Sequence, residues 1–270
     1  CGRVCARFCE QVCTRGDKDA PVAIDEVKKF IAEQELHSDK RYVPKKKFEK
    51  GHKIAVVGGG PAGLSCAYYL AVYGHEVTVF EKQEKAGGMM MYGMPSFRLE
   101  RDVVDAEIDV LRQLGVVIKT GVEVGKDVTL QELREEGFKG FYLAIGAQGG
   151  RKLGISGEDA EGVISGIDFL RSVAADAEKT LPKKVVVVGG GNVAVDVARS
   201  AVRCGAEEIS MFCLESRETM PAASDEVAEA EEEGIQIQCG FGPKEILTEN
   251  GKVTGIVFKR CLAVKDAEGR

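Results

Sequence analysis

Residues 53–63 read KIAVVGGGPAG, and this stretch decides the fold. Its first half, up to Val57, is a short apolar run of the kind that forms a buried strand. Its second half fits the pattern G-x-G-x-x-G, and a helical run, Leu64 to Tyr73, follows it. The next strand-like run ends at Glu81, close to the spacing of roughly 20 residues that dinucleotide-binding units show. The stretch therefore predicts a βαβ unit that binds a dinucleotide.

The residue types of this unit suit that chemistry. Gly58 allows a tight turn, Gly60 lets the backbone approach a pyrophosphate, and Gly63 lets the helix pack close to the strand. The helix N-terminus offers unpaired N–H groups and a positive dipole to phosphates. Glu81 can accept hydrogen bonds from a ribose diol. A glycine turn without a ligand is the alternative, and the complete strand–helix–strand context disfavours it.

The same pattern restarts at a second strand-like run, Val185–Val188, which leads into a G-x-G-x-x-A motif over residues 189–194. Strands that alternate with helices predict parallel sheets covered on both faces. We therefore expect an α/β fold with two Rossmann-like dinucleotide-binding domains. Two dinucleotide sites in one chain are typical of proteins that pass hydride from a nicotinamide to a flavin.

The acid of the second unit indicates which nicotinamide cofactor binds. Glu215 follows the strand-like run 208–213, where a carboxylate would bind an unphosphorylated adenosine ribose. Arg217 lies nearby and is the type of residue that holds a 2′-phosphate. On this charge argument the sequence favours NAD(H) over NADP(H).

Composition excludes several classes of protein. The chain has 270 residues, with 37 Lys and Arg against 43 Asp and Glu, for a net charge of −6. This acidity disfavours nucleic-acid binding. No apolar run approaches the roughly 20 residues that cross a bilayer, so we expect no membrane partner. We also expect a cytoplasmic location.

Four of the nine cysteines, Cys1, Cys5, Cys9 and Cys13, recur at every fourth residue. On a helix, such positions would lie along one slowly drifting face. Thiolates grouped this closely favour an iron–sulfur cluster. Zinc comes second, because C-x₃-C is not a usual zinc spacing, and oxidised or idle thiols come third.

The other cysteines are scattered, and we expect them to be small buried hydrophobes. They are Cys66, Cys204, Cys213, Cys239 and Cys261. Disulfide reductases with two dinucleotide sites carry C-x₄-C beside the flavin or C-x-x-C in the nicotinamide domain, and neither motif occurs here. The sequence therefore predicts no dithiol chemistry and an exit for electrons through the cysteine-rich start.

Further motifs give the chain a specific family resemblance. They are Cys1-Gly2-Arg3-Val4-Cys5 with Cys9-Glu10 and Cys13, Gly87-Gly88 through Gly93-Met94-Pro95 to Phe97-Arg98-Leu99, Leu143-Ala144-Ile145-Gly146-Ala147, Gly189-Gly190-Gly191-Asn192 with Asp196, and Met220-Pro221-Ala222. In this order they resemble the glutamate synthase small-subunit (beta chain) family of FAD, NAD(P) and [4Fe-4S] oxidoreductases. Many members of that family carry Arg-Arg where this chain has Leu214-Glu215.

The resemblance assigns FAD to the first site and the nicotinamide cofactor to the second. The residues implied at the first site are Gly58, Gly60, Pro61, Ala62, Gly63, Glu81, Lys82, Gly88, Arg98, Ala144 and Gly146. Those implied at the second are Gly189, Gly190, Gly191, Asn192, Val193, Asp196, Leu214, Glu215 and Arg217. The metal ligands implied are Cys5 and Cys9 for one [4Fe-4S] cluster and Cys13 for its neighbour, with Cys1 as a further candidate.

The resemblance also predicts the organisation of the chain as a fragment of a longer protein, truncated at both ends. We expect a partial helical [4Fe-4S] segment and linker over residues 1–50, an FAD-binding domain over 51–160 and an NAD(P)-binding domain over 161–270. The remaining cluster ligands would lie before residue 1, and the last FAD-domain segment after residue 270.

The function that the resemblance implies is hydride transfer from NAD(P)H to FAD, with single electrons passed through the clusters to a partner subunit or a ferredoxin. We expect no catalytic acid–base side chain. The acceptor could be a glutamate synthase large subunit, or a partner in a hydrogenase, formate dehydrogenase or bifurcating transhydrogenase complex. The alternative is a nucleotide-binding scaffold or redox sensor that does not turn over.

Overall fold

The structure is a computed structural model that describes residues 2–48, 51–176 and 178–264. The chain divides into two compact units, Cys1–Ala147 (unit 1) and Gln148–Arg270 (unit 2). Each unit contains its own parallel sheet and its own hydrophobic core, as the repeated strand and glycine motifs predict. The limits expected from the sequence between the cysteine-rich segment and the FAD-binding domain (50/51) and between the FAD- and NAD(P)-binding domains (160/161) stay predictions.

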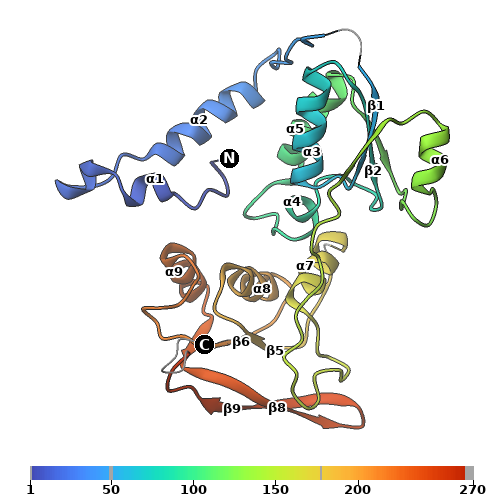
Figure 1. The fold of residues 1–270 in the computed structure, drawn as a ribbon. Coiled ribbons are helices and arrows are strands. Elements are labelled where there is room, and N and C mark those ends of the chain that lie inside the picture. The colour runs from blue at the N-terminus through green and yellow to red at the C-terminus, as the bar shows by residue number, and fades with distance from the viewer. Residues whose placement is uncertain (1, 49–50, 177, 265–270) are drawn as a thin grey trace. The chain divides into compact units, whose positions relative to one another are not determined.

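Unit 1 contains most of the helices (Figure 1). In chain order its elements are α1 (Phe8–Gln11), the 3-10 helix η1 (Thr14–Asp17), α2 (Ile24–Leu36), β1 (Lys53–Val57), α3 (Pro61–Val72), β2 (Glu76–Glu81), α4 (Met89–Tyr92), α5 (Arg101–Gln113), β3 (Val117–Thr120), α6 (Leu130–Glu135) and β4 (Gly140–Leu143).

The sheet of unit 1 has the strand order β3-β2-β1-β4, and its neighbours pair in parallel. Alternate residues serve its two faces, as the period of a strand requires. Val56 and Val79 belong to the core under α3 and α5. Ala55 and Phe80 belong to a second cluster that includes Leu133 of α6. Both faces are thus covered, as predicted, and each fully buried Val or Phe contributes about 1.5–3 kcal/mol.

Unit 2 has a different arrangement of layers (Figure 1). Its elements are α7 (Gly166–Ala175), β5 (Lys184–Val188), α8 (Asn192–Arg203), β6 (Glu208–Cys213), α9 (Ser224–Glu232), β7 (Gln236–Cys239), β8 (Phe241–Glu249) and β9 (Lys252–Arg260). The parallel sheet has the order β5-β6-β7, and residues of α7, α8 and α9 form one core with it.

An antiparallel hairpin of β8 and β9 packs against β6 through aromatic side chains. The Phe212 ring stacks on Phe258 with centroids 4.0 Å apart, and Phe241 meets it edge-on at 6.1 Å. The hairpin also bridges to Ser156 and Glu161 in the segment before α7. In unit 2, therefore, a hairpin takes the place that a helix holds in unit 1.

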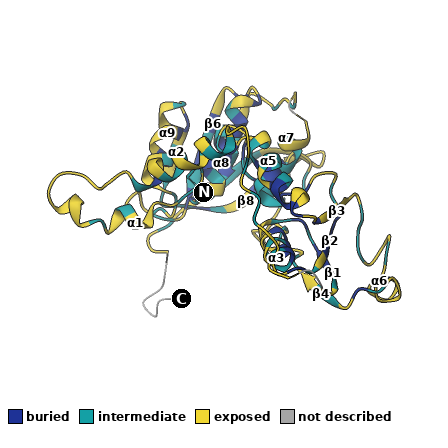
Figure 2. Cartoon of the chain, turned by 90° about the horizontal axis from the view of Figure 1, so that it is seen from above, coloured by how far each residue is buried: buried dark blue, intermediate teal, exposed yellow. Residues whose placement is uncertain are grey.

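The cysteine-rich start of unit 1 has little buried surface (Figure 2). The spacing of Ile24, Val27, Phe30 and Ile31 predicts a helix, and α2 confirms it. Its apolar side chains are nonetheless exposed, with Phe30 at 61% and Ile31 at 62%, whereas Asp25 is buried. Helix α2 is therefore held by polar contacts rather than by a core of its own.

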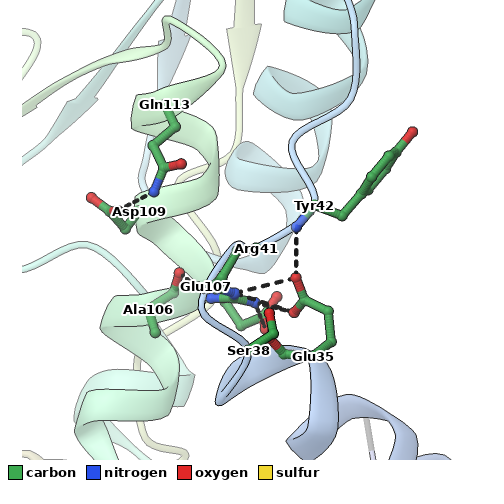
Figure 3. A network of polar contacts seen from close by, with 8 residues as sticks. All are labelled: Glu35, Ser38, Arg41, Tyr42, Ala106, Glu107, Asp109 and Gln113. Atoms are coloured by element: carbon green, nitrogen blue, oxygen red, sulfur yellow. Dashed lines mark hydrogen bonds and ion pairs between the residues drawn. The ribbon is translucent and has the colours of Figure 1, made fainter.

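Arg41 forms the main polar contact between the end of α2 and α5 (Figure 3). It donates to the Glu35 carboxylate at 2.7 Å, to Glu107 at 2.8 Å and to the Ala106 carbonyl at 2.7 Å. The hydrogen bond from Arg41 lowers the pKa of Glu35. This clamp fixes the segment that carries the cysteines to the dinucleotide-binding part of unit 1.

None of the helices in the described ranges combines the length and hydropathy that a bilayer crossing needs.

Candidate functional site

The first glycine turn joins β1 to α3. Gly58 has φ +107°, which only glycine adopts readily, and its N–H donates to the Phe80 carbonyl at 2.8 Å. A Cβ added to Gly58 would lie 2.2 Å from the Ala144 carbonyl oxygen. Ala144 is held there because its N–H donates to Val57 at 2.7 Å. The structure therefore brings Gly58 and Ala144 together.

Gly63 sets the approach of α3 to this turn. A Cβ at Gly63 would lie 1.9 Å from the Gly58 carbonyl oxygen, so any side chain there would force the helix away. Pro61 and Ala62, at the exposed start of α3, complete the first helical turn. The N–H groups of a first turn have no partner within the helix. Beyond its chain neighbours, Gly88 Cα is the one atom of the described ranges within 4 Å of a Cβ added to Gly60, which leaves room there for a phosphate.

Glu81 lies at the end of β2 beside the turn. Its side chain is 7% exposed, and one carboxylate oxygen accepts a hydrogen bond from Gly59 N–H at 2.7 Å. The other accepts from Gln83 N–H at 2.8 Å. A carboxylate has about four acceptor positions, so two remain for a ribose diol. Lys82, the next residue, is exposed.

The segment from Gly87 to Arg98 lies against the glycine turn. Gly87 N–H donates to the Gly59 carbonyl at 2.7 Å, and a Cβ on Gly88 would meet Gly60 Cα at 2.7 Å. Arg101 holds the segment from α5 by donating to the carbonyls of Met90 and Met94, both at 2.6 Å. Burial lowers the pKa of Arg101.

Two further residues are implied at the first site. Arg98 is half-buried at the end of the segment. Gly146 is exposed beyond β4 with φ +70°. Their roles at a cofactor stay predictions.

The second glycine turn repeats the backbone plan of the first. Gly189 N–H donates to the Phe212 carbonyl at 2.8 Å, as Gly58 does to Phe80. Apart from its chain neighbours, no atom of the described residues lies within 4 Å of a Cβ added to Gly191, so the start of α8 is open in the described part of the chain. Asn192 accepts a hydrogen bond from Ala223 N–H at 2.8 Å, which fixes the segment after Pro221 to this turn. Val193 is 54% exposed, and Asp196 is buried in α8.

Strand register shows which residues correspond between the units. Val57 pairs with Phe80, and Val188 pairs with Phe212. The residue after Phe80 is Glu81, so Cys213 occupies the corresponding position in unit 2.

Glu215 nevertheless reaches the same place from the loop beyond β6. A Cβ on Gly190 would lie 3.0 Å from Glu215 Oε2 and 2.8 Å from Cys213 Cβ. Leu214, between them, is 44% exposed. Arg217 is paired with Glu231 at 2.6 Å and thus faces α9.

The cysteines of the first segment do not share one helical face. Helix α1 covers only residues 8–11, so Cys5 and Cys13 lie outside it, and Cys9 within it is exposed. Lys28 of α2 donates to Cys5 Sγ at 3.3 Å and also pairs with the buried Asp25. The hydrogen bond with Cys5 raises the pKa of Lys28. A positive charge is thus placed beside Cys5.

Cys13 has the environment of a stabilised thiolate. Hydrogen bonds from the backbone of Val22 above all, and of Arg15 and Gly16, lower the pKa of the Cys13 thiol. N–H donors around sulfur are a common feature of cluster ligands. Within the described ranges no three His, Cys, Asp or Glu side chains gather as a metal site. Cys1 lies outside the described residues.

Sequence reasoning missed three residues that shape these sites: Lys28, Arg101 and Ala223. Lys28 lay in a polar helix with no motif. Arg101 follows the Phe97-Arg98-Leu99 motif, but its targets are backbone carbonyls, which leave no trace in the sequence. Ala223 acts through its backbone N–H, which every residue except proline carries.

Residues 52–266 match the pyridine nucleotide-disulphide oxidoreductase family. The chain belongs to this family. Residues 1–40 match dihydropyrimidine dehydrogenase domain II with its 4Fe-4S cluster. The predicted α/β fold and oxidoreductase class are therefore confirmed. The two family matches also confirm the predicted cofactors FAD, NAD(P) and [4Fe-4S].

Individual proteins resemble the chain along its length. The chain is 39% identical to the beta subunit of the NADP(+)-dependent formate dehydrogenase of Moorella thermoacetica, over 99% of this chain and 41% of that protein. It is 33% identical to the small chain of the NADPH glutamate synthase of Escherichia coli, over 100% of this chain and 60% of that protein. The resemblance to the glutamate synthase small chain is thus confirmed.

The chain spans 41% of the first of these relatives and 60% of the second. Both are named as one chain of a larger enzyme, so partner chains are a feature of these relatives. Among solved structures, FprA of Mycobacterium tuberculosis in complex with NADPH has the same fold. It matches with a TM-score of 0.68 and 21% identity, over 82% of this chain and 66% of that one.

Proposed function

We propose that this chain is the NAD(P)H-oxidising part of an electron-transfer oxidoreductase, with FAD in unit 1, a nicotinamide dinucleotide in unit 2 and [4Fe-4S] ligands in the first segment. One observation carries the proposal. Two glycine turns of the same backbone plan, each followed by a carboxylate beside its middle glycine, occur in two separate parallel sheets. A single turn would fit many nucleotide-binding proteins, whereas the pair fits a hydride donor and its acceptor.

The residues of unit 1 fit the adenosine and pyrophosphate half of FAD. The exposed first turn of α3 and the space beside Gly60 would receive the pyrophosphate, and Glu81 would hold the ribose. The Gly87–Arg98 segment, held by Arg101, would lie along the flavin. A bound flavin takes two electrons from a nicotinamide and releases them singly to a cluster.

The residues of unit 2 fit a dinucleotide without a 2′-phosphate, so we propose NAD(H) as the preferred substrate. The open space at Gly191 would receive the pyrophosphate. Glu215 lies over Gly190, where its charge favours a ribose diol and repels a phosphate. Arg217, the cation that would counter this charge, is engaged by Glu231.

Cys5, Cys9 and Cys13 are the proposed cluster ligands, together with residues outside those described. Their soft thiolates suit iron, and the N–H groups around Cys13 and the ammonium of Lys28 beside Cys5 offset thiolate charge. The role of this chain is to bind and orient the cofactors, without a catalytic acid–base side chain. The proposed acceptor is an electron-accepting protein subunit or a ferredoxin, in the cytoplasm.

Anaerobic reduction of the full-length protein tests this function. NADH or NADPH would be mixed with the protein while the flavin and then the cluster absorbance are followed. We expect NADH to bleach the flavin rapidly and the clusters to follow. Faster bleaching by NADPH would contradict the NAD(H) preference and leave the electron-transfer function standing. With FAD bound, the absence of bleaching by both nucleotides would favour the scaffold or sensor.

A further inference from the structure

Two thiols that are far apart in the sequence meet at the ends of β6 and β7. Cys213 and Cys239 are register partners in these neighbouring parallel strands. The Cys213 thiol donates toward Cys239 Sγ, and the two sulfur atoms are 3.7 Å apart. Adjacent strands lie about 4.8 Å apart, which is within the Cα separation of roughly 4.4–6.8 Å that disulfides require.

The two thiols differ in access to solvent. Cys213 is 2% exposed, and its sulfur also lies 3.7 Å from the Glu215 carbonyl oxygen. Burial, with Cys239 and Glu215 nearby, raises the pKa of Cys213 to about 12. Cys239 is only partly buried. An oxidant from solvent would therefore meet Cys239 first, with Cys213 directly behind it.

The pair adjoins the second glycine turn. A Cβ on Gly190 would lie 2.8 Å from Cys213 Cβ, and Cys213 is joined to Glu215 through Leu214. The Glu215 carbonyl accepts a hydrogen bond from Gly240 N–H at 2.9 Å, directly after Cys239. Any movement of the two sulfur atoms therefore acts on the residues that surround the middle glycine.

We propose that Cys213 and Cys239 form a reversible disulfide by exchange with an organic disulfide, and that this oxidation weakens dinucleotide binding at the adjoining glycine turn. A disulfide brings the sulfur atoms from 3.7 Å to about 2.05 Å, so the two side chains must turn toward each other. The contact of Cys213 with the Glu215 carbonyl is lost in the process. The effect on binding, but not the disulfide itself, rests on the proposed function of unit 2.

The exchange takes place in two steps. The Cys239 thiolate attacks one sulfur of the organic disulfide, forms a mixed disulfide and releases one thiolate. The Cys213 thiolate then attacks the Cys239 sulfur and releases the second. The two protein thiols lose two electrons and two protons, and the organic disulfide is reduced to two thiols that take up those protons.

Oxidation of the full-length protein with glutathione disulfide under anaerobic conditions tests whether the Cys213–Cys239 disulfide forms. Mass spectrometry of its peptides should find Cys213 linked to Cys239, and dithiothreitol should reverse the link. Cys239→Ser and Cys213→Ser should each abolish it. Cys204→Ser, at a buried thiol elsewhere in unit 2, should leave it intact. If Cys239 carries only glutathione, or both thiols remain open to alkylation, the proposal is wrong.

The affinity for NADH and NADPH, measured before and after oxidation, tests whether the disulfide weakens dinucleotide binding. We expect the dissociation constant for the preferred nucleotide to rise roughly 5-fold or more on oxidation and to recover with dithiothreitol. Cys239 is only partly buried, so Cys239→Ser should fold normally, and because this variant cannot form the link, glutathione disulfide should leave its affinity unchanged. An unchanged affinity in the linked wild-type protein would overturn the coupling. If the reduced protein binds neither nucleotide, the proposed function and the coupling both fail, whereas the cross-link result stands by itself.

Discussion

The two units differ at the end of their second strand. Phe80 of unit 1 and Phe212 of unit 2 occupy matching register positions, but Glu81 follows Phe80 whereas Cys213 follows Phe212. Glu81 is buried and receives two backbone N–H groups. Glu215, by contrast, reaches its glycine from a loop and is only partly buried. One backbone plan therefore supports a fixed carboxylate in one unit and an adjustable one in the other.

The difference matches two uses of a dinucleotide site. A resident cofactor is served by a carboxylate that does not move, and a substrate that enters and leaves in every cycle is served by a more open site. The beginnings of the helices agree with this view. A Cβ at Gly60 would have Gly88 as a neighbour, whereas among residues 2–48, 51–176 and 178–264 only chain neighbours lie within 4 Å of a Cβ at Gly191.

Substitution of the matching residues Gly63 and Ala194, which face the two turns, should destabilise the two units by different amounts. Gly63→Ala places a Cβ against the Gly58 carbonyl oxygen and should destabilise unit 1 by about 3 kcal/mol, with loss of FAD. Its counterpart Ala194→Gly only lowers helix propensity, by about 1 kcal/mol. Thermal unfolding and retained flavin absorbance of the full-length protein measure both. Equal effects would show that the turns are not differently packed.

Reversal of charge at the second turn should change cofactor preference. The double substitution Leu214→Arg with Glu215→Arg supplies donors for a 2′-phosphate, and each charge-assisted hydrogen bond contributes about 1.5–3 kcal/mol. We expect the ratio of kcat/KM for NADPH to that for NADH to rise at least about tenfold. Glu215→Gln, which removes a charge without adding a cation, is the control and should move the ratio less. If the ratio does not change, these positions do not contact the ribose.

Replacement of the carboxylate by an amide should lower the stability of the protein more at Glu81 than at Glu215. In Glu81→Gln an amide group would face the N–H of Gly59 or of Gln83, which costs about 1–3 kcal/mol. Glu215→Gln has no such conflict and should change stability by about 0.5 kcal/mol or less. Urea unfolding of both variants checks this. A similar cost at the two positions would contradict the comparison.

Acid should weaken unit 2 through one ion-pair cluster. Arg203 above all, with Arg199, lowers the pKa of Glu233 to about 2, and an unfolded Glu has a pKa of about 4.3. Because the folded pKa is depressed, this stabilisation is complete above about pH 4.3 and is lost as the pH falls toward about 2.

The variant Glu233→Gln should therefore lower the Tm of the full-length protein at pH 7 and converge with the wild type near pH 2. Glu35→Gln, which breaks the Arg41 clamp of unit 1, should show a pH dependence of the same direction, because Arg41 also lowers the pKa of Glu35. A Tm difference at Glu233 that does not change with pH would exclude the ion pair as its cause.

Local patterns in the sequence predicted those parts of the fold that local patterns determine. The valine runs before Gly58 and Gly189 predicted β1 and β5, and the glycine spacing predicted both turns with their helices. The sequence also placed carboxylates at Glu81 and Glu215, because the acid follows the second strand of each unit. These features depend on neighbours within one βαβ unit.

Features that depend on the pairing of distant segments could not be predicted. Cys213 and Cys239 meet only because β6 and β7 pair in one particular register, so the absence of C-x-x-C concealed a close thiol pair. The exposed face of α2 followed the periodicity of a buried helix, since a pattern reports amphipathicity and not the presence of a partner. The packing of Phe258 on Phe212 is likewise a contact between segments far apart in the chain.

The hydrogen bonds from Gly59 and Gln83 to Glu81 affect the entropy of ligand binding at the first glycine turn. They select one rotamer of the Glu81 carboxylate while the protein folds. The entropic cost of ordering this side chain, about 0.5–1.5 kcal/mol, therefore belongs to folding and does not reduce the binding free energy. Unit 1 is preorganised in this respect. Amide hydrogen exchange at Gly59 and Gln83 should therefore be equally slow in the flavin-free and flavin-loaded protein.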